Sequence, residues 1–201
     1  MSAFALKIIA MVTMFIDHLF ASCIDPYGVD VWNISRHIVP GTGTTLYWIG
    51  RMIGRIAFPI FCFQIVEGVR YTKNWKRYMA RLALLALISE IPFDLMYGGT
   101  WFYPIHQNVI WTLLIGLSGI HLMEKTRKKQ KLTIFLPTAV LVVLVGSALG
   151  TVGMADYYGA GVLTLFIFYF FRGRKWWCFS GQLLALYWVN VELLGGLMYP
   201  I

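Results

Sequence analysis

Charged residues are scarce in this 201-residue chain. They make up 13% of the sequence, against 59% hydrophobic and 16% aromatic residues. The mean hydropathy of +0.68 lies outside the range of ordinary soluble domains. The composition therefore excludes a soluble globular protein and predicts a polytopic membrane protein.

Cysteine is also rare, with only three residues, Cys23, Cys62 and Cys178, each alone in an apolar stretch. No C-x-x-C motif or even-numbered set indicates a disulfide framework. The four histidines show no metal-ligand spacing, so the sequence predicts no metal centre.

Long hydrophobic runs define the expected fold. A spanning helix needs about 17–25 residues, or fewer at polar edges. Seven windows are drawn at 4–24, 46–69, 82–97, 105–123, 132–149, 157–171 and 176–199. The first contains Asp17 and His18 and is followed by no small-residue cleavage pattern, which favours a span over a cleaved signal peptide. We expect an all-α transmembrane bundle of about seven spans, forming one domain over residues 1–201.

The basic residues predict the orientation of this bundle. Cytoplasmic loops of membrane proteins carry an excess of Lys and Arg. With a cytoplasmic N-terminus, 14 of the 17 cations fall on the cytoplasmic side: Lys7, Arg70, Lys73, Lys76, Arg77, Arg81, Lys125, Arg127, Lys128, Lys129, Lys131, Arg172, Arg174 and Lys175. Topology thus accounts for the net charge of +8 without a nucleic-acid partner.

Polar side chains within the spans gather on the other side of the membrane. On this topology, the outer halves or outer ends of the spans carry Asp17, His18, Arg51, Arg55, Glu90, Asp94, His106, Gln107, Asn108, Asp156 and Glu192. Ionisable residues in a bilayer are costly and mark a functional site by default. We therefore expect a polar site in the outer half of the bundle.

Helical spacing groups four of these residues. Arg51 and Arg55 are separated by four positions, as are Glu90 and Asp94, so each pair projects from one helix face. Two cations can then face two carboxylates, either as a structural ion-pair network or as part of a binding site. The Gly50-x-x-x-Gly54 pattern predicts close helix contact, within one protomer or in a homo-oligomer.

The sequence supports different predictions for His18 and Glu67. His18 is a candidate general base at neutral pH, or a core histidine satisfied by packing and one hydrogen bond. Glu67 lies about 18 Å from Arg55 along the helix, at the cytoplasmic end. It is expected beside a basic loop from Arg70 to Arg81, which either sets topology and contacts anionic lipid or binds a polyanion such as a nucleotide or coenzyme A.

Several sequence strings resemble one family: KIIAMVTMFIDH, RMIGRIAFPIFCFQIVEGVRYT, YMARLALLALISEIPFDLMY, QNVIWTLLIG and DYYGAGVLT. They are similar, over nearly the whole chain, to the TraX family of conjugal-transfer membrane proteins. This resemblance implies a bacterial inner-membrane acyltransferase that uses cytoplasmic acetyl-coenzyme A and is related to acetylation of the pilin N-terminus. The chain ends at MYPI, where relatives continue into another hydrophobic segment.

The resemblance marks ten positions, which are Asp17, His18, Arg51, Arg55, Glu67, Glu90, Asp94, Gln107, Asn108 and Asp156. In the resulting hypothesis, His18 with Asp17 and Asn108 is catalytic. Arg51, Arg55, Glu90, Asp94, Gln107 and Asp156 hold the small-molecule or peptide acceptor. Glu67, Arg70, Arg77 and Arg81 hold acetyl-coenzyme A, with no metal. The alternatives are a proton-coupled transporter and a membrane assembly factor without chemistry.

Overall fold

The computed structural model of the protein describes residues 2–23, 49–127, 132–173 and 175–189. In these residues the regular structure is helical, which confirms the all-α prediction: α1 (Ala3–Cys23), α3 (Ala57–Tyr71), α4 (Trp75–Gly98), α5 (Val109–Arg127), α6 (Leu132–Val152), α7 (Tyr158–Phe170) and α8 (Trp176–Trp188). Residues 49–54 are helical as well. Glu192 lies outside the described residues.

Three described helical segments are long and apolar enough to cross a membrane: Ala3–Ala21, Ile49–Tyr71 and Leu132–Val152. They correspond to the first, second and fifth expected spans. Tyr158–Phe170 is a shorter apolar helix. The count of seven spans and the cytoplasmic N-terminus remain predictions.

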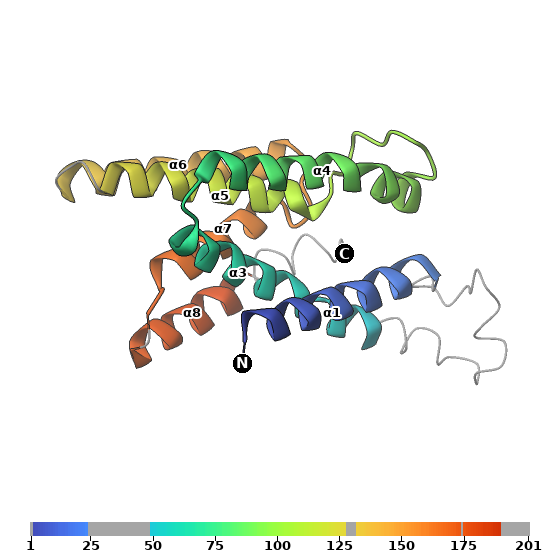
Figure 1. The fold of residues 1–201 in the computed structure, drawn as a ribbon, viewed down its shortest axis with the longest axis horizontal. Helices are drawn as coiled ribbons and strands as arrows, with labels where there is room; N and C mark the ends of the chain where they lie inside the picture. Colours follow the sequence, from blue (N-terminus) through green and yellow to red (C-terminus); the bar gives the residue numbers. More distant parts are fainter. Residues whose placement is uncertain (1, 24–48, 128–131, 174, 190–201) are drawn as a thin grey trace. The chain divides into compact units, whose positions relative to one another are not determined.

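The chain forms two compact units, residues 1–64 and 65–201. In the first unit, α1 lies beside the helical residues that lead into α3 (Figure 1). Small residues permit this contact, because a Cβ atom on Gly50 would overlap the Phe20 ring and one on Gly54 would overlap the Asp17 side chain. The predicted close approach at the glycine pair is therefore present within one protomer.

Proline explains a break in the second span. The helix is interrupted at Arg55 and Ile56 and resumes at Ala57. Pro59 has no N–H to donate to the Arg55 carbonyl, and its ring would clash with that carbonyl in a continuous helix. The break in the helix therefore lies directly at Arg55.

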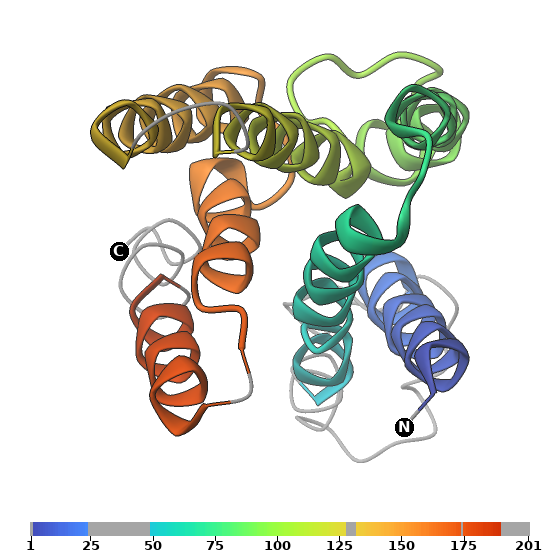
Figure 2. The ribbon, with the colours of Figure 1, turned by 60° about the vertical axis from the view of Figure 1, so that its left-hand side comes forward.

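The second unit is built around α7. This helix packs on α5, α6 and α8, while α4 packs on α5 (Figure 2). Leu117 and Ile120 of α5 and Val162, Leu165 and Phe166 of α7 are almost completely buried. Gly116 and Gly146 lie against Leu165 and Phe166, respectively, so small residues bring the helix axes close together.

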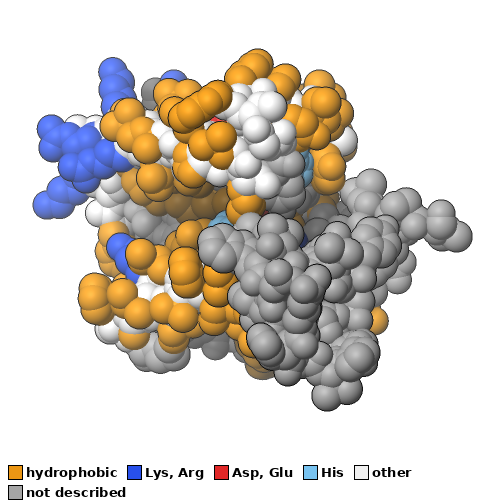
Figure 3. Space-filling model, turned by 90° about the vertical axis from the view of Figure 1, so that its right-hand side faces the viewer, with side chains coloured by type: hydrophobic (Ala, Val, Ile, Leu, Met, Phe, Trp, Pro, Cys, Tyr) orange, Lys and Arg blue, Asp and Glu red, His pale blue; other side chains and the backbone are white. Residues whose placement is uncertain are grey.

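The outer surface of this unit is apolar. Leu136, Leu141 and Leu144 of α6 and Leu84 and Ile88 of α4 are all exposed. A water-soluble monomer rarely exposes such continuous apolar faces. Figure 3 shows hydrophobic side chains over most of the described surface in that view, with Lys and Arg gathered at one edge. The exposed faces are suited to contact with lipid.

Two boundaries correct the sequence analysis. The expected basic loop from Arg70 to Arg81 is mostly helical, because α3 continues to Tyr71 and α4 begins at Trp75. Asn74 caps α4 by accepting a hydrogen bond from the Arg77 backbone N–H at 3.0 Å. Lys and Arg are good helix formers, so a segment rich in these residues can be helical and need not be a loop.

The fourth expected span, 105–123, instead corresponds to α5 from Val109 to Arg127. His106, Gln107 and Asn108 therefore precede the helix. Asn108 accepts a hydrogen bond from the Ile110 N–H at 2.9 Å, in the manner of an N-cap. The sequence around these residues is apolar enough for a helix, but the Gln107 backbone is hydrogen-bonded to Met154 and Asp156 instead.

Candidate functional site

The first unit contains a cluster of Asp17, His18, Arg51 and Arg55, here called the N-terminal cluster. Arg51 Nη1 donates to Asp17 Oδ2 at 2.6 Å, and each side chain is 14% exposed. The Asp17 carboxylate also interacts electrostatically with His18 and Arg55. The cluster therefore brings together a carboxylate, an imidazole and two guanidinium groups from residues that the sequence analysis had selected.

Arg51 has an ion-pair partner within its own unit, which is Asp17. The sequence analysis allowed Arg51 and Arg55 to face Glu90 and Asp94, and that arrangement stays a prediction. Gly54 makes room for the Asp17 side chain. The two carboxylates of α4 belong to the second unit and have partners there.

The second unit contains a polar cluster where the α4–α5 connection meets the α6–α7 turn, here called the acidic–amide cluster. Its members are Glu90, Asp94, Tyr103, His106, Gln107, Asn108, Trp111, Thr112 and Asp156. Five of these, Glu90, Asp94, Gln107, Asn108 and Asp156, are site residues expected from the sequence. The structure thus brings together residues from four separate stretches of chain.

Glu90 is held by neutral donors. Its Oε2 accepts from Trp111 Nε1 at 2.8 Å and from the Asn108 amide, and its Oε1 accepts from the Asn108 backbone N–H at 3.4 Å. Asn108 is 3% exposed and its amide also donates to the Ala86 carbonyl at 2.9 Å. Both hydrogens of the Asn108 amide are therefore used.

Asp94 anchors the loop between α4 and α5. It is 2% exposed, and its Oδ2 accepts from the Tyr103 N–H at 3.0 Å. Its Oδ1 is buried and has no hydrogen-bond partner among the described residues. A buried oxygen of this kind costs free energy, which makes Asp94 suited to a donor that arrives with a ligand.

Gln107 and Asp156 are joined through the backbone. Gln107 N–H donates to the Met154 carbonyl at 2.9 Å, and Asp156 N–H donates to the Gln107 carbonyl at 2.9 Å. Thr112 is buried and its hydroxyl donates to the Asp156 carbonyl. The turn after α6 is therefore fixed to the start of α5.

His106 lies against this turn. Its Nε2 is 3.7 Å from Asp156 Oδ1, and its ring is 5.5 Å from Phe93 and 6.2 Å from Tyr158 between centroids. Burial lowers the pKa of His106. The sequence analysis placed His106 in this region without giving it a role.

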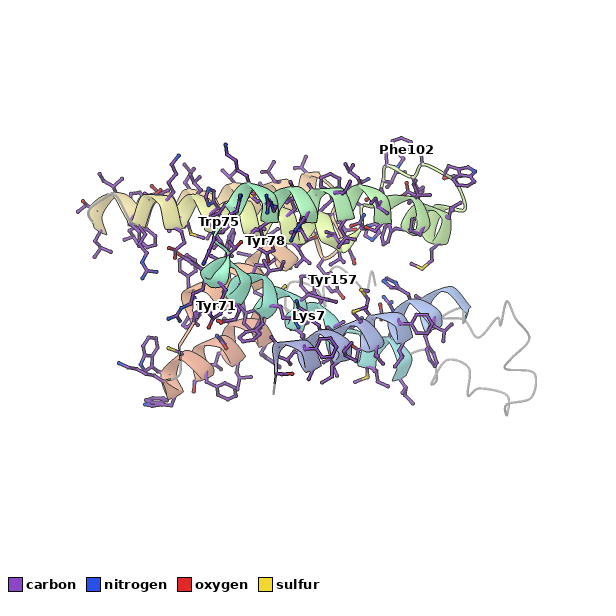
Figure 4. All side chains as sticks on the ribbon, in the orientation of Figure 1. Lys7, Tyr71, Trp75, Tyr78, Phe102 and Tyr157 are labelled. Atoms are coloured by element: carbon purple, nitrogen blue, oxygen red, sulfur yellow. The ribbon has the colours of Figure 1, made fainter. Side chains whose placement is uncertain are left out.

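The opposite ends of the same helices form a basic region, here called the basic end: Arg70, Lys73, Lys76, Arg77, Arg81, Lys125, Arg127, Arg172 and Lys175. Tyr169 Oη donates to Glu124 at 2.8 Å, and the Trp75 and His121 rings are in tilted contact, 4.3 Å apart between centroids, so the ends of α4, α5 and α7 meet. Figure 4 shows Trp75 and Tyr78 where α4 begins.

Glu67 has a different partner from the one expected. Arg172 Nε donates to Glu67 Oε1 at 2.7 Å, with both side chains about half-buried. Arg70, Arg77 and Arg81 are exposed instead. Arg172 follows α7, more than a hundred residues after Glu67, so sequence proximity suggested the wrong arginines.

Trp111, Tyr103, Thr112 and Arg172 were not predicted as site residues. Trp111 had one usable signal, since an indole N–H in an apolar helix needs an acceptor, and its spacing of three from Asn108 places both near one face. Tyr103 contributes its backbone N–H, and the Thr112 hydroxyl donates to the Asp156 backbone carbonyl. The sequence carries no signal for either contact, because both involve backbone groups. In the described residues no group of three or more His, Cys, Asp and Glu side chains could hold a metal ion.

The sequence profile of the TraX protein family matches residues 2–199 of the chain. The chain belongs to the TraX family. It is also 29% identical, over 126 residues, to the probable fimbrial assembly protein FimC, serogroup H1, of Dichelobacter nodosus. This alignment covers 59% of the chain and 45% of the relative, so less than half of the relative's length is matched. No solved structure matches the chain.

Proposed function

We propose that this TraX-family protein is an integral-membrane acetyltransferase of the bacterial inner membrane. It transfers the acetyl group of acetyl-coenzyme A to an amine or hydroxyl acceptor. The observation that carries the proposal is the acidic–amide cluster. Glu90, Asn108 and Trp111 form a hydrogen-bonded network at one end of α4 and α5, in a helical unit whose basic residues lie at the other end.

The basic end fits the polyanionic donor. Phosphates are bound by Arg and Lys, and Arg77 and Arg81 project from α4 with their side chains exposed. Glu67 orients a further arginine of the basic end, Arg172, by accepting a hydrogen bond from its Nε. Arg81 precedes Glu90 by nine residues, or about 14 Å along the helix. A donor held at the basic end would therefore extend its thioester along α4 toward the cluster.

The chemistry requires a base and an oxyanion donor. We assign the base to His18, beside Asp17 and Arg51, as the sequence indicates. Removal of the acceptor's proton by a positioned base accelerates such transfers by roughly 10²–10⁴-fold. Gln107 is a better oxyanion donor than Asn108, because both hydrogens of the Asn108 amide are used, whereas the Gln107 amide donates to Pro104 at 3.2 Å and is more exposed.

The acceptor we favour is the N-terminus of a fimbrial or pilus subunit. Support comes from the family and from the fimbrial assembly protein that shares part of the sequence. An assembly factor without chemistry is the second candidate, for the same reason. Release of free coenzyme A in the presence of acceptor separates the two.

The first experiment is binding of acetyl-coenzyme A to the detergent-purified protein by calorimetry, with coenzyme A and ATP as competitors. We expect saturable binding that is weakened by the double substitution of Arg77 and Arg81 with Gln. The matched control is Lys7→Gln, which removes an exposed cation from α1 in the other unit. Absence of binding to folded, monodisperse protein would refute the donor assignment.

The second experiment concerns the base. His18→Ala is expected to leave acetyl-coenzyme A binding intact and to abolish coenzyme A release. Full activity in this variant would remove His18 from the mechanism.

A further inference from the structure

A second histidine lies beside a carboxylate, in the acidic–amide cluster. His106 Nε2 and Asp156 Oδ1 are 3.7 Å apart, and the two side chains are 20% and 26% exposed. This separation is longer than a hydrogen bond, as is common for catalytic groups before the substrate binds. Partial exposure leaves the imidazole a route for proton exchange with water.

The turn that carries Asp156 is held in an unfavourable backbone conformation. Met154, Tyr157 and Tyr158 have φ values of 51°, 62° and 47°, in the left-handed region. Such residues cost about 1–3 kcal/mol each and persist only where surrounding contacts impose them. Here the contacts are the two backbone hydrogen bonds to Gln107 and the Thr112 hydroxyl on the Asp156 carbonyl. The fold therefore fixes Asp156 relative to His106.

The neighbouring carboxylates favour a cation. In the described part of the chain, Glu90 and Asp94 accept hydrogen bonds from neutral groups, namely Asn108, Trp111 and the Tyr103 backbone. The two carboxylates lie one helical turn apart on α4. An amine acceptor, which is an ammonium ion at neutral pH, would be attracted in its unreactive protonated form.

We propose that His106, positioned by Asp156, removes the first proton from the ammonium form of the acceptor. This inference rests on the proposed acetyl transfer. The N–H bond of the ammonium breaks, its proton moves to His106 Nε2, and the electron pair left on nitrogen becomes the nucleophile. That nitrogen then forms the bond to the acetyl carbon, the C–S bond breaks, and the second proton ends on the coenzyme A sulfur. The proton on His106 passes to water.

The surroundings of His106 suit an imidazole that accepts a proton and then releases it to water. Among the described residues, the titratable groups on the elements packed against it include Asp156 from the α6–α7 turn, Tyr158 from α7, and Glu90 and Asp94, which lie near Phe93 on α4. Burial lowers the pKa of the imidazole. The neutral form is thus available at neutral pH, and the imidazolium formed by proton transfer is stabilised by Asp156.

The test compares two acceptors of the same chain length. One is an alkylamine, which is protonated at neutral pH, and the other is an O-alkylhydroxylamine, which is not. His106→Gln is expected to lower the rate of coenzyme A release with the alkylamine by about 100-fold at pH 7, within the range for general base catalysis, and to leave the rate with the hydroxylamine nearly unchanged. The alkylamine defect should shrink as the pH rises and free amine accumulates.

Asp156→Asn provides a second readout. Loss of the carboxylate destabilises the imidazolium, so the acidic limb of the alkylamine pH–rate profile should move to lower pH. His121→Gln is the control, since this histidine lies at the other end of α5 against Trp75. It should leave the ratio of the two acceptor rates unchanged.

Equal losses with both acceptors in His106→Gln, or no loss with either, would overturn the inference. So would transfer to neither acceptor by the unsubstituted protein. Acetyl-coenzyme A binding measured on the same samples shows whether the proposed function fails as well, because His106 is not part of the donor site.

Discussion

Substitution of Asn108 by Ala should destabilise the protein more than any neighbouring change in the α4–α5 connection. The side chain caps α5 by accepting from the Ile110 N–H, and its amide donates to Ala86 and to Glu90. Loss of an N-cap costs about 1 kcal/mol. Loss of a neutral hydrogen bond costs about 1 kcal/mol, and loss of one to a charged group about 2 kcal/mol.

These contributions overlap, because all three pass through one buried amide, so we expect a loss of about 3 kcal/mol in the free energy of unfolding. Unfolding in mixed detergent, followed by circular dichroism, measures this quantity. Gln107→Ala is the matched control, since its side chain makes one local hydrogen bond, to the Pro104 carbonyl. It should cost less than about 1 kcal/mol.

A double-mutant cycle with Glu90→Gln isolates the contact between the two side chains. We expect a coupling free energy of about 1–2 kcal/mol between Asn108 and Glu90. An Asn108→Ala variant as stable as the Gln107→Ala control would refute the view that this network holds the cluster together.

Three further predictions follow from the other contacts. Arg51→Ala should lower the free energy of unfolding by about 2–4 kcal/mol, because it leaves the largely buried Asp17 carboxylate without its Arg51 ion pair. The double substitution Asp17→Asn with Arg51→Gln should recover part of this loss, and equal stability of the single and double variants in detergent unfolding would contradict the prediction. Arg172→Gln should change the free energy of unfolding by less than about 1 kcal/mol, since the ion pair of Arg172 with Glu67 is partly exposed. The same substitution should weaken acetyl-coenzyme A binding in calorimetry. A large change in the thermal midpoint would show a structural role for Arg172 instead. Because burial lowers the pKa of His106, the folded state binds a proton at this imidazole less readily than the unfolded state. Stability is therefore lost as the pH falls through the unfolded pKa of about 6.5. The thermal midpoint should drop less between pH 7.5 and pH 5 in His106→Gln than in the unsubstituted protein, and equal drops would contradict this prediction.

Much of the cluster geometry was accessible from the sequence. Glu90, Asp94, Gln107, Asn108 and Asp156 were placed together because alternating topology brings the same ends of successive helices to one side, and the structure assembles all five in one unit. Partner choice was not accessible. Arg51 pairs with Asp17, and Glu67 pairs with Arg172, because pairing depends on which helix faces meet in space.

The sequence by itself determined the helical fold, the apolar surface and the positions along the chain where polar residues interrupt it. These properties follow from composition and from local signals such as Pro59 and the Asn74 cap, which act within a few residues. Only the tertiary structure decided that Trp111 and Asn108 donate to Glu90, that Tyr103 donates to Asp94, and that His106 lies beside Asp156. Those contacts join separate stretches of chain, and they form because a buried polar group in an apolar bundle is stabilised by a hydrogen-bond partner.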